Sequence, residues 1–271
     1  MSFDIEEILE INKFSHLHDG DRIFFCKTDY LNQAFPEIAK VPNDVILISG
    51  NSDLQITENQ FLNKPNNVVK WFCQNKHVDE DILVPIPIGI ENRTPCKIPG
   101  HGKVWGHAPI KHEIINSHAN IAPEKVLYSN FTIDSRRHPA RNIWMKIAET
   151  SEHITVDRNM QNPYGVWVEN VLKHEAVLCP LGNSPGSPDS DNHRIYEVLY
   201  LNRIPVVHVK SSYDKLHHKF PVILIENLED VGNESFMRQQ IDKVKNKNMD
   251  KKFLNFSHWK NIILEAKESL K

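Results

Sequence analysis

The chain has 271 residues, of which 40% are hydrophobic and 25% are charged, so it can bury a sizeable core and suits one large domain or two of ordinary size. Its formal net charge of -3 gives it no general affinity for nucleic acid or for an acidic membrane, so any anion site must be local. No apolar run approaches the roughly 20 residues that a membrane span needs, and the N-terminus lacks the basic and apolar character of a secretory signal. The cysteines form no CxxC pair. We therefore expect a cytoplasmic protein with reduced thiols.

The first half of the chain predicts a largely parallel sheet. Short runs rich in Val, Ile and Phe each close on polar or Gly residues, which is typical of parallel strands whose C-terminal ends carry functional groups. These runs lie at 21–26, 43–53, 67–75 and 81–92. The connections between them are short, so the crossover helices must be brief or irregular.

Residues 95–124 break this pattern with Pro, Gly and several His, and we interpret them as a hinge or linker. The histidines lack a tight metal-ligand spacing, so we expect them at the surface. They are His101, His107, His112 and His118. The chain is therefore divided into an N-terminal domain at 1–121 and a C-terminal domain at 122–271.

The second half alternates strands and helices. Strands are expected at 125–131, 153–158, 175–181, 204–209 and 221–227, and helices at 142–152, 163–174 and 193–202. This βαβ alternation is typical of a second doubly wound unit. The predicted fold class is α/β, with two Rossmann-like doubly wound domains facing a cleft. The amphipathic helix at 253–271 can pack back on the N-terminal domain.

An arginine at the start of the helix at 193–202 raises the question of a bound anion. Arg194 opposes the helix dipole at a cost of about 0.3–1 kcal/mol, and an anion at the helix start reverses that effect. The apolar residues of this helix share one face: Ile195, Val198 and Leu199. Arg194 and Glu197 project elsewhere, either as an exposed ion pair or as the phosphate and ribose contacts of a nucleotide-diphosphate pocket. The preceding loop favours the pocket, because its small residues allow backbone amides to approach an anion. It also offers four residues that can cap the helix: Ser187, Ser190, Asp191 and Asn192.

Two stretches resemble exostosin-like glycosyltransferases. LCPLGNSPGSPDSDNHRIYEVLYLNRIPVV at 178–207 has the Arg-x-x-Glu helix and Ile-Pro-Val strand of that group, and VLYSNFTIDSRRHPAR at 126–141 has its Asn-Phe strand end followed by arginines. The resemblance implies a GT-B fold with the nucleotide-sugar in the second domain and the acceptor in the first. The first half shows much less of the pattern. Without the anchor of the animal and plant members, the chain is more similar to small soluble transferases of bacteria and of large algal DNA viruses. A viral member would act in the cytoplasm of its host.

By that resemblance Arg194 binds the diphosphate and Glu197 binds the ribose. The basic loop after residue 131 is either a solvated surface loop or part of the same site. The second alternative is supported because guanidinium groups stabilise a departing UDP or GDP in a dry cleft. The remaining predicted donor-binding residues are Arg141, Arg136, Asn130, Ser190, Asp191, Asn192 and His193, with Arg137 behind them.

Glycosyl transfer with inversion needs a base that takes the proton of the acceptor hydroxyl. We expect it at a strand end of the first domain, with Asp53 first, Asp29 second, and then His77 and Glu91. Asn51 and Asn75 are predicted to orient the acceptor. The Asp-x-Asp at 189–191 could hold a divalent cation, but the neighbouring arginine can neutralise the phosphates itself. We therefore expect no metal site and no cofactor.

The sequence thus predicts a glycosyltransferase that moves a sugar from a nucleotide-sugar to a hydroxyl of a glycan or glycoprotein. A UDP-sugar is favoured, with UDP-xylose as one candidate. Two other classes stay open. A nucleotide-sugar hydrolase or epimerase would share the donor pocket but need no acceptor groove, and a non-catalytic module would bind the nucleotide or glycan without turnover.

Overall fold

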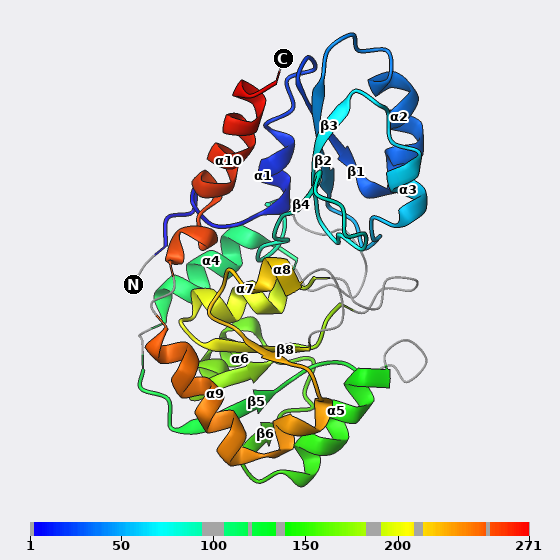
Figure 1. The fold of residues 1–271 in the computed structure, drawn as a ribbon. Coiled ribbons are helices and arrows are strands. Elements are labelled where there is room, and N and C mark those ends of the chain that lie inside the picture. Colours follow the sequence, from blue (N-terminus) through cyan, green and yellow to red (C-terminus); the bar gives the residue numbers. More distant parts are fainter. Residues whose placement is uncertain are drawn as a thin grey trace.

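The computed structural model of the protein describes residues 3–93, 106–118, 121–133, 139–182, 191–208, 214–247 and 250–270. These residues form two α/β units, one above the other in Figure 1, each built on its own sheet. All strand pairs within both sheets are parallel. The predicted α/β class with two parallel units is therefore confirmed.

The N-terminal sheet follows chain order, β1-β2-β3-β4. Its strands are β1 (Ile23–Lys27), β2 (Val45–Gly50), β3 (Val68–Cys73) and β4 (Leu83–Pro85). One face carries α2 (Leu31–Ile38) and α3 (Glu58–Leu62), and the other carries α1 (Ile11–Ser15) and α10 (Phe256–Glu268) (Figure 1). The short helix η1 (Thr28–Tyr30) leads directly into α2. Every residue of β2 is buried, as expected for a parallel strand covered on both faces.

The C-terminal sheet has the order β6-β5-β7-β8-β9. Its strands are β5 (Lys125–Ser129), β6 (Ile154–Val156), β7 (His174–Leu178), β8 (Ile204–His208) and β9 (Ile223–Ile225). Its helices are α5 (Pro139–Thr150), α6 (Tyr164–Leu172), α7 (His193–Tyr200), α8 (Asp214–His217), η2 (Leu228–Gly232), α9 (Glu234–Asn246) and η3 (Lys251–Leu254). The strand order reverses between β5 and β7, and ligands of such sheets bind beyond the strand ends at that point.

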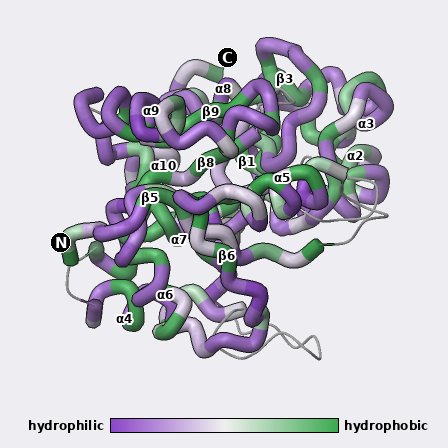
Figure 2. Tube along the Cα trace, turned by 90° about the horizontal axis from the view of Figure 1, so that it is seen from below, coloured by the Kyte–Doolittle hydropathy of each residue, from purple (hydrophilic) through white to green (hydrophobic). Residues whose placement is uncertain are grey.

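Hydropathy follows these layers. In Figure 2, α9 alternates between hydrophilic and hydrophobic residues. Such alternation is expected of a helix that buries one side against a sheet. Among the residues that the structure describes, no helix is both long and apolar enough to cross a membrane.

The predicted linker contains a helix that belongs to the core. α4 (Ala108–Ser117) lies between the two sheets in Figure 1 and packs against α6. Ala108, Lys111 and Ile115 are buried on it at a spacing of three and four. Within the segment at 95–124 that we interpreted as a hinge or linker, α4 is therefore a packed helix and not an irregular connection. His107, His112 and His118 are half-buried there, and His101 lies outside the described residues.

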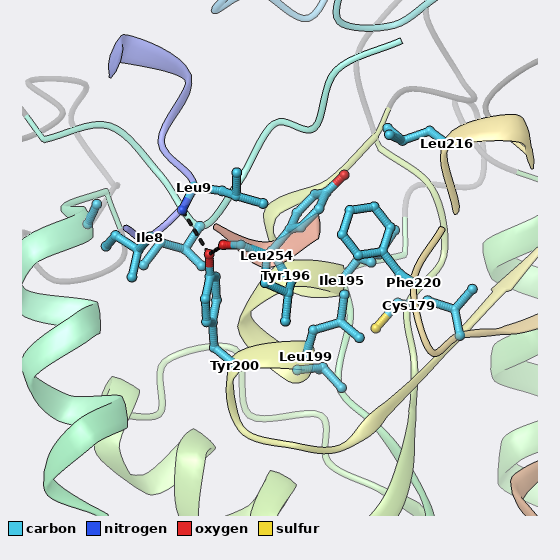
Figure 3. Close-up of a cluster of buried hydrophobic side chains, with 14 of the residues drawn as sticks. Ile8, Leu9, Cys179, Ile195, Tyr196, Leu199, Tyr200, Leu216, Phe220 and Leu254 are labelled. Carbon is cyan, nitrogen blue, oxygen red and sulfur yellow. Dashed lines mark hydrogen bonds between the residues drawn. The ribbon is translucent and has the colours of Figure 1, made fainter. Parts of the chain in front are cut away.

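The centre of the molecule is α7, which is buried from Ile195 to Tyr200. A single buried cluster joins side chains of both units around it, and Figure 3 shows part of that cluster. The Tyr200 hydroxyl accepts a hydrogen bond from the Leu9 backbone N–H at 2.8 Å and donates one to the Leu254 carbonyl at 2.6 Å. One side chain of α7 thus ties segments near both chain ends to the middle of the fold.

Candidate functional site

A cavity of about 260 Å³ lies where the strand order of the C-terminal sheet reverses. Asn130, Phe131 and Thr132 line it from beyond β5, and Leu178 and Pro180 line it from the end of β7. The charged side chains of its wall come from both units and from α4: Glu91, Lys111, Arg141, Arg194 and Glu197. Six of the residues predicted to bind the donor therefore line this cavity together with two charged groups from the first half of the chain. The six are Asn130, Arg141, Asn192, His193, Arg194 and Glu197.

Arg194 is held rigidly in the cavity wall. Its guanidinium carbon lies 4.2 Å from the ring centroid of the buried Trp167, which is a cation–π contact. Its Nη1 donates to the carbonyl oxygen and to Oδ1 of Asn130 at 3.3 and 3.4 Å. The side chain is 24% exposed, so a planar cation is fixed in place with one part open to the cavity.

Glu197 forms a buried ion pair that was not predicted. Its Oε1 lies 2.6 Å from Nζ of Lys111, and its Oε2 lies 3.5 Å from Nε of Arg194. The side chains of Glu197 and Lys111 are 3% and 2% exposed. The interpretation of Arg194 and Glu197 as an exposed ion pair was therefore wrong. Lys111 was missed because it stood in the presumed linker, although its spacing from Ala108 and Ile115 indicates one helical face.

Arg141 of α5 joins the two loops that border the cavity. Its guanidinium donates to the carbonyl oxygens of Thr132 at 3.2 Å, Leu181 at 2.7 Å and Pro180 at 3.5 Å. Burial, and then the charge of Arg194, lower the pKa of Arg141 to about 10. It remains a cation at neutral pH and adds positive charge to the wall. The other predicted members of this group, Arg136, Arg137 and Ser190, lie outside the described residues.

The start of α7 is capped as the sequence predicted. The Oδ1 of Asn192 accepts a hydrogen bond from the Ile195 N–H at 3.3 Å, and its Nδ2 donates to the Pro180 carbonyl at 2.8 Å. The next residue, His193, reaches the other unit, because its Nδ1 lies 2.7 Å from the carbonyl oxygen of Gly89. Both side chains line the cavity.

Asp191 differs from its predicted role. Its Oδ1 accepts from the Asn192 N–H at 2.9 Å and from His217, and its Oδ2 accepts from the Tyr196 hydroxyl and from the Ile88 N–H. Its own N–H donates to Oδ1 of Asn75 at 3.1 Å. Asp191 and Asn75 are 4% and 3% exposed. They join the two units instead of lining the cavity, so the expected contacts of Asp191 with the donor and of Asn75 with the acceptor need correction.

The carboxylates placed first as bases do not reach the cavity. Asp53 and Asp29 are exposed, and neither lines it. Asn51 adopts a positive φ of 51° and bonds to other asparagines outside the cavity. Glu91, which stood last among the base candidates, lines the cavity from the N-terminal unit. Its Oε2 lies 3.7 Å from Nζ of Lys111 and 3.6 Å from Nε2 of His193, and its side chain is 14% exposed.

A larger cavity of 520 Å³ lies at the opposite end of β8. Three of its cationic side chains have partners: Lys245 pairs with Glu175, Lys251 bonds to Asn202, and Arg203 donates to backbone carbonyls. Among the described residues of the whole chain, no group of three or more His, Cys, Asp or Glu is placed to hold a metal ion. Asp189 of the Asp-x-Asp lies outside the described residues.

No family model matches this chain, and no curated protein matches it. A solved structure, described as the crystal structure of an alpha1,3-fucosyltransferase, aligns with 89% of this chain and 78% of its own, at 12% sequence identity and a TM-score of 0.42. A likeness at that level does not identify the reaction, the donor or the acceptor of this chain. The resemblance to exostosin-like enzymes stays a prediction.

Proposed function

We propose that this protein is a glycosyltransferase that binds a nucleotide-sugar in the cavity at the start of α7. The observation that carries this proposal is the placement of Arg194 and Glu197. Both are fixed in the wall of a cavity at the reversal point of a parallel sheet, where such folds bind nucleotides. Arg194 stacks on Trp167 and Glu197 pairs with Lys111, so neither is a mobile surface side chain.

The charge of the wall supports an anionic ligand. Lys111, Arg141 and Arg194 contribute three permanent cations against the carboxylates of Glu91 and Glu197, which leaves one net positive charge. The N–H groups at the start of α7 add the positive end of its dipole. A diphosphate at Arg194 would be attracted both by the net positive charge of the wall and by the positive end of the α7 dipole. The Oε2 of Glu197, 3.5 Å from Nε of Arg194, keeps a lone pair for a ribose hydroxyl.

We propose that the transfer proceeds with inversion, with the donor and the acceptor held by different units. The oxygen of the acceptor hydroxyl bonds to the anomeric carbon, while the bond from that carbon to the phosphate oxygen breaks and its electron pair leaves with the diphosphate. Glu91 takes the hydroxyl proton, because among the described residues it is the carboxylate of the N-terminal unit that lines the cavity. Arg194 and the start of α7 stabilise the charge that develops on the leaving group. This assignment replaces Asp53 as the base.

We infer further that the donor is a UDP-sugar, with UDP-xylose as one candidate, and that the acceptor is a hydroxyl of a glycan. Because Arg194 and Arg141 supply positive charge, catalysis needs no divalent metal, and activity should survive excess EDTA. Complete loss of transfer in EDTA, restored by Mg²⁺ or Mn²⁺, would overturn that part of the proposal.

The proposal is tested with a panel of UDP- and GDP-sugars. A cognate donor at 100 times its dissociation constant should stabilise the fold by about 2.7 kcal/mol, which is visible as a thermal shift. Products are then analysed with and without glycan acceptors, and NMR reads the configuration of the new linkage. Transfer to an acceptor supports the proposal. Free sugar with every acceptor indicates a hydrolase, and binding without turnover indicates a non-catalytic module.

A further inference from the structure

His193 reaches from the C-terminal unit to a fixed carbonyl of the N-terminal unit. Its Nδ1 lies 2.7 Å from the Gly89 carbonyl oxygen. A carbonyl oxygen only accepts hydrogen bonds, so Nδ1 carries the hydrogen. In the neutral ring Nε2 therefore has a free lone pair.

The turn that holds this tautomer is rigid. Gly89 has a φ of +72°, and a Cβ at this position would lie 2.1 Å from the carbonyl oxygen of Leu9. That same Leu9 oxygen accepts a hydrogen bond from the Ile90 N–H at 3.0 Å. The turn therefore fixes the direction in which the Gly89 carbonyl points, and the hydrogen bond to this carbonyl fixes the orientation of the His193 ring.

The free nitrogen of His193 faces Glu91, the proposed base. Its Nε2 lies 3.6 Å from Oε2 of Glu91, and the His193 side chain is 30% exposed. The charged groups around this pair are Lys111 from α4, Arg141 from α5, and Arg194 and Glu197 from α7. The Glu197 carboxylate is engaged by Lys111 and Arg194, at 2.6 and 3.5 Å, which leaves His193 as the other proton acceptor beside Glu91 among the described residues of this wall.

We propose that His193 is a positioning residue that acts through Glu91, because it takes up the proton that Glu91 removes from the acceptor hydroxyl. This proposal rests on the proposed glycosyl transfer. The O–H bond of the acceptor breaks, its proton passes through a carboxylate oxygen of Glu91 to Nε2 of His193, and Glu91 returns to its charged form. The ring becomes an imidazolium with hydrogens on both nitrogens.

The position of His193 couples this proton to the leaving group. A diphosphate bound at the start of α7 places negative charge beside His193. His193 therefore gains its proton as negative charge develops on the diphosphate, and it helps to stabilise that charge.

Two substitutions separate proton uptake from the structural contact. His193→Asn keeps an N–H donor for the Gly89 carbonyl but has no group at the Nε2 position, and His193→Gln places an amide near Nε2 that cannot take a proton. Both should keep the fold and bind UDP or GDP within about threefold of the wild type, which corresponds to under about 0.7 kcal/mol. Both should lose about 100-fold in kcat, with KM for the donor nearly unchanged.

The pH profile provides a readout that a structural role would not move. Wild-type kcat should rise with pH through the range in which imidazoles titrate, about 5 to 8, and this limb should be absent from both variants. The control is His153→Gln, which replaces a histidine that also bonds a carbonyl, that of Val231, but lies outside the cavity. It should keep both kcat and the limb.

Histidine ¹⁵N NMR tests the proposal without turnover. With the His193 signal assigned by its loss in His193→Asn, the free protein should show the Nδ1–H tautomer, and saturating UDP or GDP should shift the ring toward imidazolium. An Nε2–H tautomer would overturn the geometry. A wild type that transfers sugar, with both variants retaining kcat and the acid limb, would overturn this inference alone. A wild type that transfers no sugar from any donor would overturn the proposed function and this inference with it.

Discussion

Replacing Lys111 by Met should destabilise the protein strongly, although the residue lies in a segment that reads as a linker. The substitution keeps most of the side-chain volume and removes the charge. Glu197, 3% exposed, then loses its partner at 2.6 Å, and the Ile90 carbonyl loses a donor at 3.0 Å. Removing one partner of a buried ion pair costs about 3–5 kcal/mol, and because Arg194 still lies 3.5 Å from Glu197 we expect a loss of about 3 kcal/mol in the free energy of unfolding.

The assay is urea denaturation with an exposed pair as the control. Lys40 and Glu37 are 2.8 Å apart, with side chains 69% and 71% exposed, so Lys40→Met should cost less than about 0.5 kcal/mol. Adding Glu197→Gln to Lys111→Met removes the stranded charge and should recover about 2 kcal/mol. If Lys111→Met cost no more than Lys40→Met, or if Glu197→Gln added to its loss, the account of a buried, charge-paired site would be refuted.

Gly89→Ala should lower the free energy of unfolding by at least about 3 kcal/mol, because a Cβ would lie 2.1 Å from the Leu9 carbonyl oxygen. Gly20→Ala is the control, because Gly20 has a φ of +75° but no atom within 4 Å of its Cβ, so it should cost only the backbone strain of about 1–2 kcal/mol. Equal losses in the two variants would contradict the tight turn at Gly89. Burial works to raise the pKa of Asp19, but the backbone N–H of Ile23, the ammonium of Lys267 and two further N–H groups outweigh it, so its pKa lies below the usual range. Asp19→Asn should therefore cost about 1–2 kcal/mol at pH 7, and the difference from the wild type should shrink below pH 4 as the unfolded carboxyl takes its proton; a constant difference from pH 7 to pH 2 would exclude this cause.

The strands and helices were predictable because their signals are local. Apolar runs closing on polar residues located the four N-terminal strands, and the βαβ alternation located the second sheet. Asn192 was recognisable as a cap because capping depends on the chemistry of neighbouring residues. The short connections correctly predicted brief helices, such as the five residues of α3.

The environment of the site could not be predicted in the same way, because it depends on contacts between distant segments. The apolar stripe of α7 suggested a helix buried on one side, but α7 lies between two units and is covered all round, so Glu197 is buried. Glu91 and Lys111 reach the cavity only when the two sheets are stacked. Asp191 was interpreted as part of an anion-binding loop. The neighbouring sequence gave no sign that Asp191 would instead form hydrogen bonds with Ile88 and Asn75 of the other unit.

The central claim, that Arg194 binds the diphosphate of a nucleotide, is tested most directly by calorimetric titration of UDP and GDP into Arg194→Ala. The control is Arg238→Ala, whose guanidinium is 53% exposed on α9 and lies outside the cavity. Losing two charge-assisted hydrogen bonds costs about 3 kcal/mol, so the dissociation constant of the better nucleotide should rise about 100-fold in Arg194→Ala and stay within twofold of the wild type in Arg238→Ala. Equal affinities in the two variants, with both folded, would contradict the account.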